Sequence, residues 1–307
     1  MVQDIRKRPL GTTGLHVSEI GFGALEIGRD WAGDVDPNPK HLTESEAARL
    51  LNQVLDTGIN FIDTAPAYWH SEEFIGRSIA HRRDEFILAT KVGEHCDERG
   101  SVYDYSREAT RRFIDESLRR LRTDTIDLIQ IHSASLEVLE RGETWEALDE
   151  ARQAGKVRHI GMTGGVREAV RAIELGGYET VQVPYNLLSL EAEEKLLPLA
   201  RERGIGVIIM RGLAGGKLSP KFENLQNEEL REAVRGFLQF VGPDGARDLV
   251  HLAIGYILGA PEVSTVIVGS RKFEHVQTNL TAARGFLPAE LREKVRSYAR
   301  SIAVRAW

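Results

Sequence analysis

The sequence predicts an α/β fold, a (β/α)₈ TIM barrel in one domain over residues 1–307, with an N-terminal hairpin and extra helices in the C-terminal third. Three observations support this prediction. Eight short apolar runs recur along the chain, segments with helical spacing lie between them, and no low-complexity linker divides the 307 residues. The main rival is a doubly wound open sheet, which usually carries GxGxxG in its first βα turn. Here the first strand leads into GFGALEIG instead.

The first predicted element is the hairpin, in LGTTGLHV, where a turn is flanked by apolar residues. The strands of the barrel follow it, and each is a run of strand length with β-branched residues. In chain order these runs are SEIGFGAL, INFID, FILATK, TIDLIQIH, VRHIGMTG, TVQVPYN, GVIIMRG and VSTVIVGS. Their number and their alternation with helical segments favour the barrel over the open sheet.

The helices between these strands are predicted from caps and apolar spacing. Thr43 to Glu46 read TESE, a capping-box pattern, and an apolar stripe follows at Ala47, Leu50, Leu51, Val54 and Leu55. Ser106 can cap the next long helix, whose expected buried face is Ala109, Phe113, Leu118 and Leu121. Further helices are expected over 144–154, 166–175, 190–203, 247–258 and 273–282, with one more in the 211–242 insertion. The glycines at expected helix ends are Gly58, Gly155, Gly177 and Gly204.

Bulk composition argues against several classes of protein. Lys plus Arg is 40 and Asp plus Glu is 46, so the net charge is −6, which is not that of a nucleic-acid-binding protein. The single cysteine, Cys96, allows no intrachain disulfide. The N-terminus lacks the apolar region of a signal peptide, and no apolar run approaches the roughly 20 residues that span a membrane. We therefore expect a cytoplasmic protein that acts on a small molecule.

Polar residues end three successive predicted strands, namely Asp63, Lys91 and His132, and Tyr68 follows Asp63 on the next loop. The C-terminal strand ends of a barrel surround one mouth, so these four side chains should meet there. A nearby ammonium lowers the pKa of a tyrosine from its usual value near 10, and an aspartate would keep that lysine charged. The histidine could orient a carbonyl oxygen or share the proton.

Each of these residues alone has an ordinary structural explanation. Asp63 could cap a helix, Lys91 could be solvated, His132 could be a satisfied polar residue, and Tyr68 could simply pack. Their ordered occurrence at consecutive strand ends favours a proton-donating active site. No metal is expected there, because the sequence contains no HExxH motif and no cysteine cluster.

The chain resembles the aldo-keto reductases, which are NADPH-dependent (β/α)₈ barrels. The similarity runs from PLGTTGLHVSEIGFGA through GINFIDTAPAY, SEEFIG, RRDEFILATKVG, IDLIQIH and AGKVRHIGMTG to VSTVIVGSRKFEHVQTNL. The resemblance implies a catalytic tetrad of Asp63, Tyr68, Lys91 and His132. Tyr68 would then be the general acid when an aldehyde, ketone or sugar carbonyl is reduced, and the general base when an alcohol is oxidised.

The resemblance also implies where the cofactor binds. Gly23 and Ala24 would approach the nicotinamide ribose or the pyrophosphate, and Thr163 and Gln182 would bind the nicotinamide carboxamide. The segment from Met210 to Leu218 would wrap the pyrophosphate, and Ser270, Arg271 and Lys272 would meet a 2′-phosphate. The implied cofactor-binding residues are Gly23, Ala24, Asp63, Thr163, Gln182, Met210, Arg211, Gly212, Leu213, Gly215, Gly269, Ser270, Arg271, Lys272, Gln277 and Asn279. The alternative for Arg271 and Lys272 is a solvated turn at the start of a helix.

The sequence departs from the family at positions that affect cofactor choice. The aromatic residue that commonly stacks on the nicotinamide aligns with Met210, and the serine–asparagine pair at the carboxamide reads Thr163–Gly164. An arginine common in NADPH-specific members aligns with His275, and a glutamate aligns with Thr278. The expected cofactor is NADP(H), with NAD(H) as the alternative.

The substrate pocket is expected to include Trp31, Trp69 and His70 in addition to His132, since loops near the mouth carry these residues. The alternative is that the tryptophans only cover the barrel rim. Two further functions stay open at this point. One is an NAD(P)-dependent sugar dehydrogenase, and the other is a nucleotide-sensing subunit with slow turnover, a role that some members of the family have.

Overall fold

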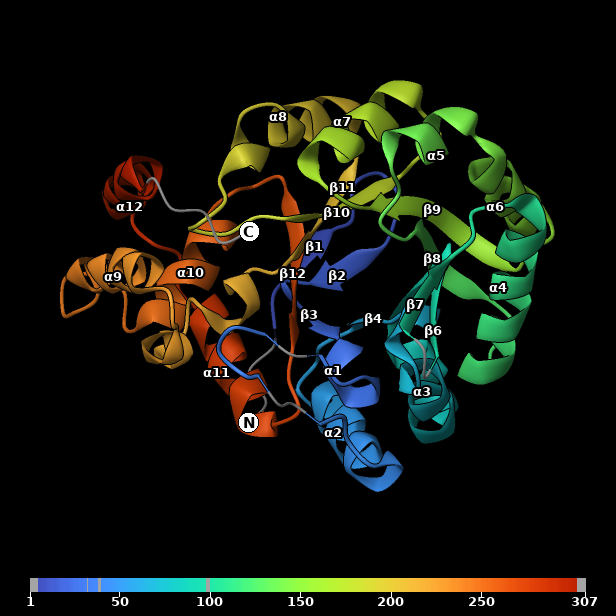
Figure 1. Cartoon of the computed structure of the whole chain (residues 1–307), viewed down its shortest axis with the longest axis horizontal. Helices are drawn as coiled ribbons and strands as arrows, with labels where there is room; N and C mark the ends of the chain where they lie inside the picture. Colours follow the sequence, from blue (N-terminus) through green and yellow to red (C-terminus); the bar gives the residue numbers. More distant parts are fainter. Residues whose placement is uncertain (1–4, 32, 38–39, 98–99, 303–307) are drawn as a thin grey trace.

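The fold is a closed barrel of eight parallel strands surrounded by helices (Figure 1), as the sequence predicts. The computed structural model describes residues 5–31, 33–37, 40–97 and 100–302. Each barrel strand pairs with the next one in the chain, and the last closes on the first. These strands are β3 (Ile20–Gly23), β4 (Phe61–Asp63), β5 (Ile87–Val92), β8 (Ile126–Ile131), β9 (Val157–Thr163), β10 (Thr180–Pro184), β11 (Gly206–Met210) and β12 (Val263–Gly269). All eight lie within the predicted runs or extend them by one residue.

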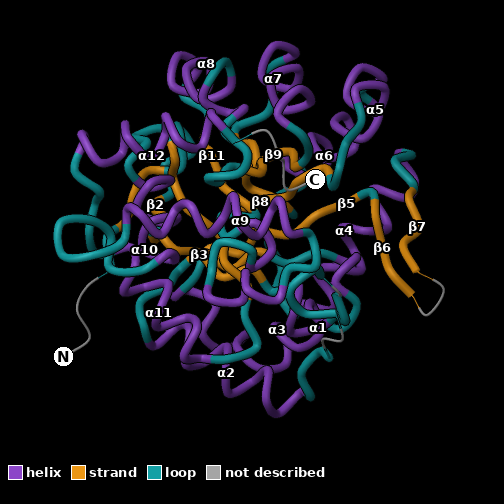
Figure 2. Tube along the Cα trace, turned by 60° about the vertical axis from the view of Figure 1, so that its left-hand side comes forward, coloured by secondary structure: helices purple, strands orange, loops and turns teal. Residues whose placement is uncertain are grey.

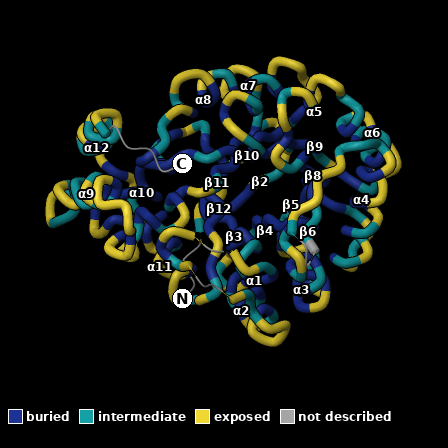
Figure 3. Tube along the Cα trace, viewed as in Figure 1, coloured by how far each residue is buried: buried dark blue, intermediate teal, exposed yellow. Residues whose placement is uncertain are grey.

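The helices cover the outside of the barrel, so that buried strands lie at the centre and exposed surface lies along the helices (Figure 3). They are α1 (Leu25–Gly28), α2 (Glu44–Asp56), α3 (Ser71–Ile79), α4 (Arg107–Leu121), α5 (Leu136–Arg141), α6 (Glu143–Gln153), α7 (Val166–Leu175), α8 (Leu196–Arg203), α9 (Glu228–Gly236), α10 (Leu249–Leu258), α11 (Phe273–Ala283) and α12 (Ala289–Ser301). Within the described ranges, no helix combines the length and the apolar character that a membrane span requires.

The predicted caps of two helices are confirmed. The Thr43 side chain accepts from the backbone of Glu46, and the Glu46 carboxylate accepts from the backbone of Thr43, which completes the capping box of α2. The Ser106 side chain accepts from the Ala109 backbone at the start of α4. Caps of this kind typically contribute about 1 kcal/mol each, so these boundaries are set by local sequence.

The helix expected over 190–203 is shorter than predicted. A 3₁₀ turn covers Glu191–Glu193, and α8 begins only at Leu196. Pro198 explains the difference, because a proline is tolerated in the first turn of a helix but breaks the hydrogen bonding of a helix interior. In the 211–242 insertion, the predicted helix appears as α9 followed by a 3₁₀ turn over Phe237–Phe240.

The predicted N-terminal hairpin consists of β1 (Lys7–Pro9) and β2 (His16–Ser18), paired antiparallel. Its Leu10 and Val17 pack with an apolar layer inside the barrel, contributed by Phe61, Ala89, Leu128, Ile208 and Ile267. Since side chains alternate along a strand, the next inward positions are Asp63, Lys91, Gln130, Met210 and Gly269. The barrel is therefore closed by apolar side chains at one end and lined by polar ones at the other.

A second hairpin, which the sequence did not predict, follows β5. It consists of β6 (Glu94–Asp97) and β7 (Gly100–Tyr103), paired antiparallel. Figure 2 shows it standing out from the barrel beside β5. Because it begins two residues after a strand that carries Lys91, it lies next to the polar end of the barrel.

Candidate active site

The four residues of the predicted tetrad meet at the C-terminal end of the barrel. Asp63 ends β4, Lys91 lies in β5, His132 follows β8, and Tyr68 closes the 3₁₀ turn Pro66–Tyr68. The Lys91 ammonium lies 4.6 Å from the centre of the Tyr68 ring. The Tyr68 and His132 rings are 5.8 Å apart and nearly perpendicular, at 82°. The positions expected from the strand ends thus come together in one place.

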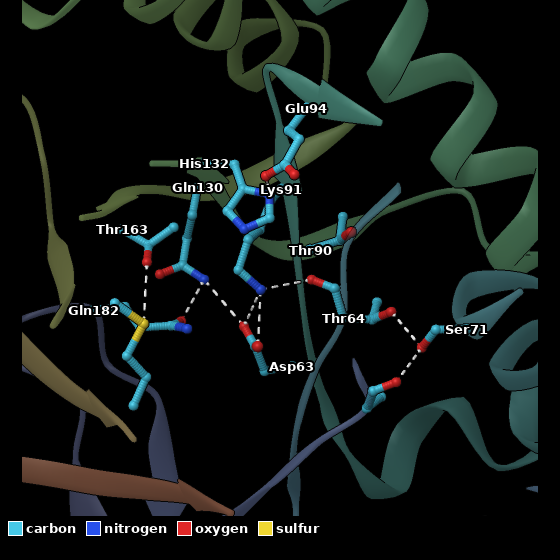
Figure 4. A network of polar contacts seen from close by, with 12 residues as sticks. Asp63, Thr64, Ser71, Thr90, Lys91, Glu94, Gln130, His132, Thr163 and Gln182 are labelled. Carbon is cyan, nitrogen blue, oxygen red and sulfur yellow. Dashed lines mark hydrogen bonds and ion pairs between the residues drawn. The ribbon is translucent and has the colours of Figure 1, made fainter. Parts of the chain in front are cut away.

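Lys91 and Asp63 form a fully buried ion pair (Figure 4). Lys91 Nζ donates to both carboxylate oxygens of Asp63 and to the Thr64 carbonyl, each at 2.8 Å. The ammonium is also hydrogen-bonded to the Tyr68 side chain, so the lysine links the aspartate to the phenol. Gln130 Nε2 donates to Asp63 Oδ1 at 3.3 Å, which gives the carboxylate a further partner.

Burial and charge act in opposite directions on this pair. Burial raises the pKa of Asp63, and the Lys91 charge only partly offsets this. For Lys91, burial favours the neutral amine, but the charges of Asp63 and Tyr68 and their hydrogen bonds prevail and raise its pKa. Lys91 is therefore an ammonium at neutral pH, as the tetrad requires.

The environment of Tyr68 differs from the expectation. Desolvation raises the pKa of Tyr68 above 10, although part of its side chain reaches the surface, and the opposing effect of Lys91 is smaller. The sign predicted for Lys91 is right, but the net shift is upward because a phenolate would lose hydration at this position. The phenol is consequently held in its protonated, proton-donating form.

His132 is largely covered and neutral. Burial lowers its pKa well below the usual value, and the positive charges of Lys91 and Arg29 lower it further. Its backbone N–H donates to the Val92 carbonyl at 2.9 Å. Its carbonyl accepts from the Tyr105 hydroxyl at 2.7 Å. These two backbone bonds fix the strand end from which the imidazole projects.

The residues expected at the nicotinamide end lie on neighbouring strands around the same mouth. Gly23 and Gly269 are paired in register on β3 and β12, and so are Thr163 and Gln182 on β9 and β10. Thr163 Oγ1 lies 3.7 Å from the Met210 sulfur. Ala24, next to Gly23, donates its N–H to the Asp63 carbonyl at 2.8 Å.

Gln130 is a site residue that sequence reasoning missed. Besides Asp63, it donates to Gln182 Oε1 at 2.9 Å, and its own Oε1 is buried without a hydrogen-bond partner. It thereby links the Lys91–Asp63 pair to the residue expected at the carboxamide. The signal was available, because Gln130 lies two residues before His132 and so faces the same side of the strand.

The loop after β11, where the resemblance implies the pyrophosphate, is a tight turn. Arg211, Ala214, Gly215 and Gly216 all have positive φ, between 51° and 90°. Backbone N–H groups of this turn, among them those of Ala214 and Gly216, donate to the carbonyls of Arg211 and Leu213. Gly212 lies against Val266, where a Cβ would approach Cγ1 to 2.8 Å, and Leu213 is half-buried. The pyrophosphate role of this loop stays a prediction.

The expected 2′-phosphate residues are already engaged with protein groups. Ser270 Oγ bonds the Lys272 N–H at 3.0 Å and His275 Nδ1 at 3.1 Å, so it is part of the turn before α11. Arg271 contacts the Asp36 carboxylate, lies 3.5 Å from Glu26, and donates to the Lys40 carbonyl at 3.0 Å. Arg271 is mostly covered, whereas Lys272 is exposed, and the phosphate role of both stays a prediction.

The remaining adenosine-end residues lie on α11 and differ in exposure. Gln277 is exposed, whereas Asn279 is buried. Glu26 and Asp36 were not predicted here, because they are distant in sequence from Arg271 and follow no motif. Across the part of the chain that the structure describes, no group of three or more His, Cys, Asp or Glu residues is arranged to hold a metal ion.

Of the residues expected in the substrate pocket, Trp31 and Trp69 are exposed and His70 is half-buried. Trp69 stacks on His70 with ring centres 4.3 Å apart, and both line a cavity of about 450 Å³ with Pro66, His95 and Arg112. None of the tetrad lines that cavity. Trp31 is half exposed, and the Arg29 guanidinium lies 5.3 Å from its ring. Arg29 is also one of the two cations that lower the pKa of His132.

Cavity size alone would misplace the site. A cavity of about 820 Å³ lies at the opposite end of the barrel, lined by the N-terminal hairpin and by residues such as Gly204, Leu258 and Arg292. It contains none of the buried acid–base groups. We place the active site by the tetrad, because chemistry requires those side chains and not a particular volume.

Family models, related sequences and solved structures all indicate the same protein family. The model of the Aldo/keto reductase family matches residues 19–299. The structure of aldo-keto reductase AKR11C1 from Bacillus halodurans, in its holo form, is 31% identical with a TM-score of 0.83 and covers 96% of each chain. L-galactose dehydrogenase of Arabidopsis thaliana is 32% identical over 91% of this chain and 88% of its own length. NADH-specific methylglyoxal reductase of Escherichia coli is 29% identical over 91% and 93%.

The buried ion pair generates the first testable expectation. Lys91→Met should lower turnover at least about 100-fold and lower the free energy of unfolding by about 3–5 kcal/mol, because Asp63 is left buried without its counterion. The double variant Asp63→Asn/Lys91→Met should regain most of the stability and stay inactive. Urea unfolding and steady-state kinetics check both. A single variant with wild-type turnover would contradict the site.

Proposed function

The chain belongs to the aldo/keto reductase family, and from this we propose that it is an NADP(H)-dependent enzyme that reduces aldehydes, ketones or sugar carbonyls to alcohols. Members of the family are oxidoreductases that use NAD(P)H on small carbonyl substrates. The observation that supports the proposal is the buried Lys91–Asp63 pair set against the Tyr68 ring, with His132 across that ring. We propose that the enzyme works in the cytoplasm.

The residues around the mouth fit a nicotinamide cofactor. The loop from Arg211 to Gly216 is the segment proposed for the pyrophosphate, the Thr163–Gln182 pair can hold a carboxamide, and the glycines at the ends of β3 and β12 leave room beside them. When bound, the cofactor supplies or accepts the hydride. The protein then has to position the carbonyl and move one proton.

Tyr68 is the proposed general acid. Its raised pKa keeps the phenol protonated at neutral pH, which is the form that carbonyl reduction needs. As the proton leaves, negative charge develops on the phenol oxygen, and the Lys91 ammonium stabilises it in a site with little water. Asp63 holds the ammonium in place through two 2.8 Å hydrogen bonds. His132 lines the other side of the substrate oxygen.

The dehydrogenase direction is the second candidate. It is favoured by the Arabidopsis relative, an L-galactose dehydrogenase that is 32% identical to this chain. The tetrad serves either direction, since the phenol that donates a proton in reduction must accept one in oxidation. The complete tetrad favours turnover over nucleotide sensing.

For the cofactor, we propose NADP(H) over NAD(H) on the basis of Arg271. A guanidinium is suited to a phosphate, and Arg271 lies in the segment that should meet the adenosine. Its ion pair with Asp36 opposes this preference, because a 2′-phosphate would have to replace a carboxylate. The Escherichia coli relative is named NADH-specific, so both cofactors occur among similar chains.

Replacing the phenol tests the general acid. Tyr68→Phe should lower kcat about 10²–10⁴-fold while leaving the dissociation constant of NADPH within about twofold, because only the proton donor is lost. Oxidation of NADPH with 4-nitrobenzaldehyde, methylglyoxal and an aldose measures turnover, and cofactor fluorescence measures binding. Wild-type protein that binds NADPH but reduces none of these compounds would favour the sensing role instead.

The raised pKa of Tyr68 predicts the pH dependence of reduction. A folded-state pKa above 10 means that the acid form persists beyond the pH at which free tyrosine ionises. We therefore expect kcat for reduction to show no loss from phenol ionisation below about pH 10, the ordinary value. The pH dependence of kcat, measured with 4-nitrobenzaldehyde as substrate, checks this. A basic limb near pH 7 that disappears in Tyr68→Phe would contradict it.

Cofactor choice is tested at the Arg271–Asp36 ion pair. Arg271→Ala should weaken NADPH binding about tenfold and NADH binding less than about twofold, because one charged contact to phosphate is lost. Asp36→Asn breaks the same pair but keeps the guanidinium, so NADPH should bind at least as tightly as before. Equal weakening of both cofactors by both variants would show that Arg271 acts by holding the 33–36 segment.

A further inference from the structure

Glu94 is a buried carboxylate beside the tetrad that the proposed mechanism does not use. It is the first residue of β6 and is 6% exposed. Its Oε2 lies 3.0 Å from Nδ1 of His132. Figure 4 shows the carboxylate beside one nitrogen of the His132 ring, while the other nitrogen faces the side of Lys91 and Asp63. A buried acid in contact with a site histidine needs an explanation.

The second hairpin holds Glu94 in this position. Gly93 has φ of 96°, and a Cβ there would lie 2.3 Å from the Tyr105 ring, so the ring packs directly on the glycine. Tyr105 in turn donates to the His132 carbonyl. The Tyr103 hydroxyl is hydrogen-bonded to the Glu94 carboxylate. The hairpin is thus braced against the same residue that Glu94 contacts.

The contact lacks hydrogen-bond geometry as it stands. Nδ1 of His132 is buried, and although Glu94 lies within 3.0 Å, the carboxylate is out of line with the ring N–H, so Nδ1 has no well-formed partner. A buried polar atom without a partner costs about 1–3 kcal/mol. Alignment of the two groups, which are already 3.0 Å apart, would remove that cost.

The other charges around His132 leave a single proton on its ring. Lys91 from β5 and Arg29 from the segment after α1 are cations, Tyr68 faces the ring as a neutral phenol, and Asp63 is bound to Lys91. These surroundings disfavour a second positive charge. Which ring nitrogen carries the one proton then depends on the nearest acceptor. A carboxylate can only accept a hydrogen bond, so Glu94 favours the proton on Nδ1.

We propose that Glu94 is a positioning residue that keeps the proton of His132 on Nδ1, so that Nε2 faces the substrate oxygen as a hydrogen-bond acceptor. The inference rests on the proposed function, because it takes the substrate oxygen to lie between Tyr68 and His132. It changes the role expected for His132, which was to donate to a carbonyl oxygen. Tyr68 is then the donor to that oxygen, and His132 accepts.

The acceptor role has a consequence for ligand binding. An alcohol can donate its hydroxyl proton to Nε2 of His132 while it accepts from Tyr68, so both groups hold it. A carbonyl oxygen has no proton to give and is held by Tyr68 alone. The site should therefore hold the alcohol more tightly than the matching carbonyl, in contrast to a site in which both groups donate.

Nitrogen-15 NMR of protein labelled at histidine tests the tautomer without any turnover. The His132 signals are assigned by their absence in His132→Asn. We expect Nδ1 to be the protonated nitrogen in the wild type, and a shift of the proton toward Nε2 in Glu94→Gln, whose amide can donate to Nδ1. Glu108→Gln removes an exposed carboxylate of α4 and should leave the signals unchanged. A proton on Nε2 in the wild type would overturn the proposal.

Ligand binding gives the second readout, with 4-nitrobenzaldehyde and 4-nitrobenzyl alcohol as probes. In Glu94→Gln the inhibition constant of the alcohol should rise about fivefold, the equivalent of one hydrogen bond, while KM for the aldehyde does not rise. Glu94→Asp, which retains the acid, should recover part of the effect. A purely structural role would raise both constants together and lower the melting temperature, and that result would refute the proposal.

The two readouts separate this inference from the proposed function. If the tautomer changes in Glu94→Gln but no carbonyl compound is reduced by any form, the Glu94–His132 pair is supported and the reductase assignment fails. If the wild type reduces carbonyls and the tautomer is the same in Glu94→Gln, the assignment stands and the role of Glu94 is refuted.

Discussion

The structure of the site depends on one buried ion pair, between Lys91 and Asp63. Removing two charges from water costs several kcal/mol each, and their attraction offsets this only when the remaining hydrogen-bonding capacity is also satisfied. Here the Thr64 carbonyl and the Tyr68 side chain are further hydrogen-bond partners of the lysine, and Gln130 donates to the aspartate. The barrel supplies these partners from neighbouring strands, which explains why one end of its interior is polar while the hairpin end is packed with apolar side chains.

The charge of Lys91 also acts on the pKa values of two neighbouring side chains, Tyr68 and His132. Lys91 opposes the upward shift that burial imposes on Tyr68, and it reinforces the downward shift that burial imposes on His132. The result is a protonated phenol and a neutral imidazole on either side of the mouth. A neutral phenol and a neutral imidazole place no second positive charge beside the ammonium. Glu94 then decides which nitrogen of that imidazole is available.

Local sequence signals were sufficient to predict most of the fold and to predict that the four tetrad side chains meet at one end of the barrel. Apolar runs that end in Asp63, Lys91 and His132 identify the strands and their active ends, and Thr43 and Ser106 mark the helix starts they cap. The β6–β7 hairpin escaped prediction because its strands are short and its side chains mostly polar, so no periodicity distinguishes them from a loop. The net direction of the Tyr68 shift also escaped, because it depends on burial that only the folded chain defines.

The cofactor choice shows a further limit of motif reasoning. A basic residue after a strand suggests a phosphate contact only if it is not already paired, and pairing is a property of the tertiary fold. The 33–36 segment brings Asp34 to Lys217 at 2.7 Å and Asp36 to Arg271, so two segments expected to bind cofactor phosphates each meet a carboxylate. An anion that binds there exchanges one ion pair for another. Its net gain is smaller than that of an anion that meets an unpaired cation. The proposed preference for NADP(H) therefore depends on the balance between a phosphate and a carboxylate as partners of Arg271.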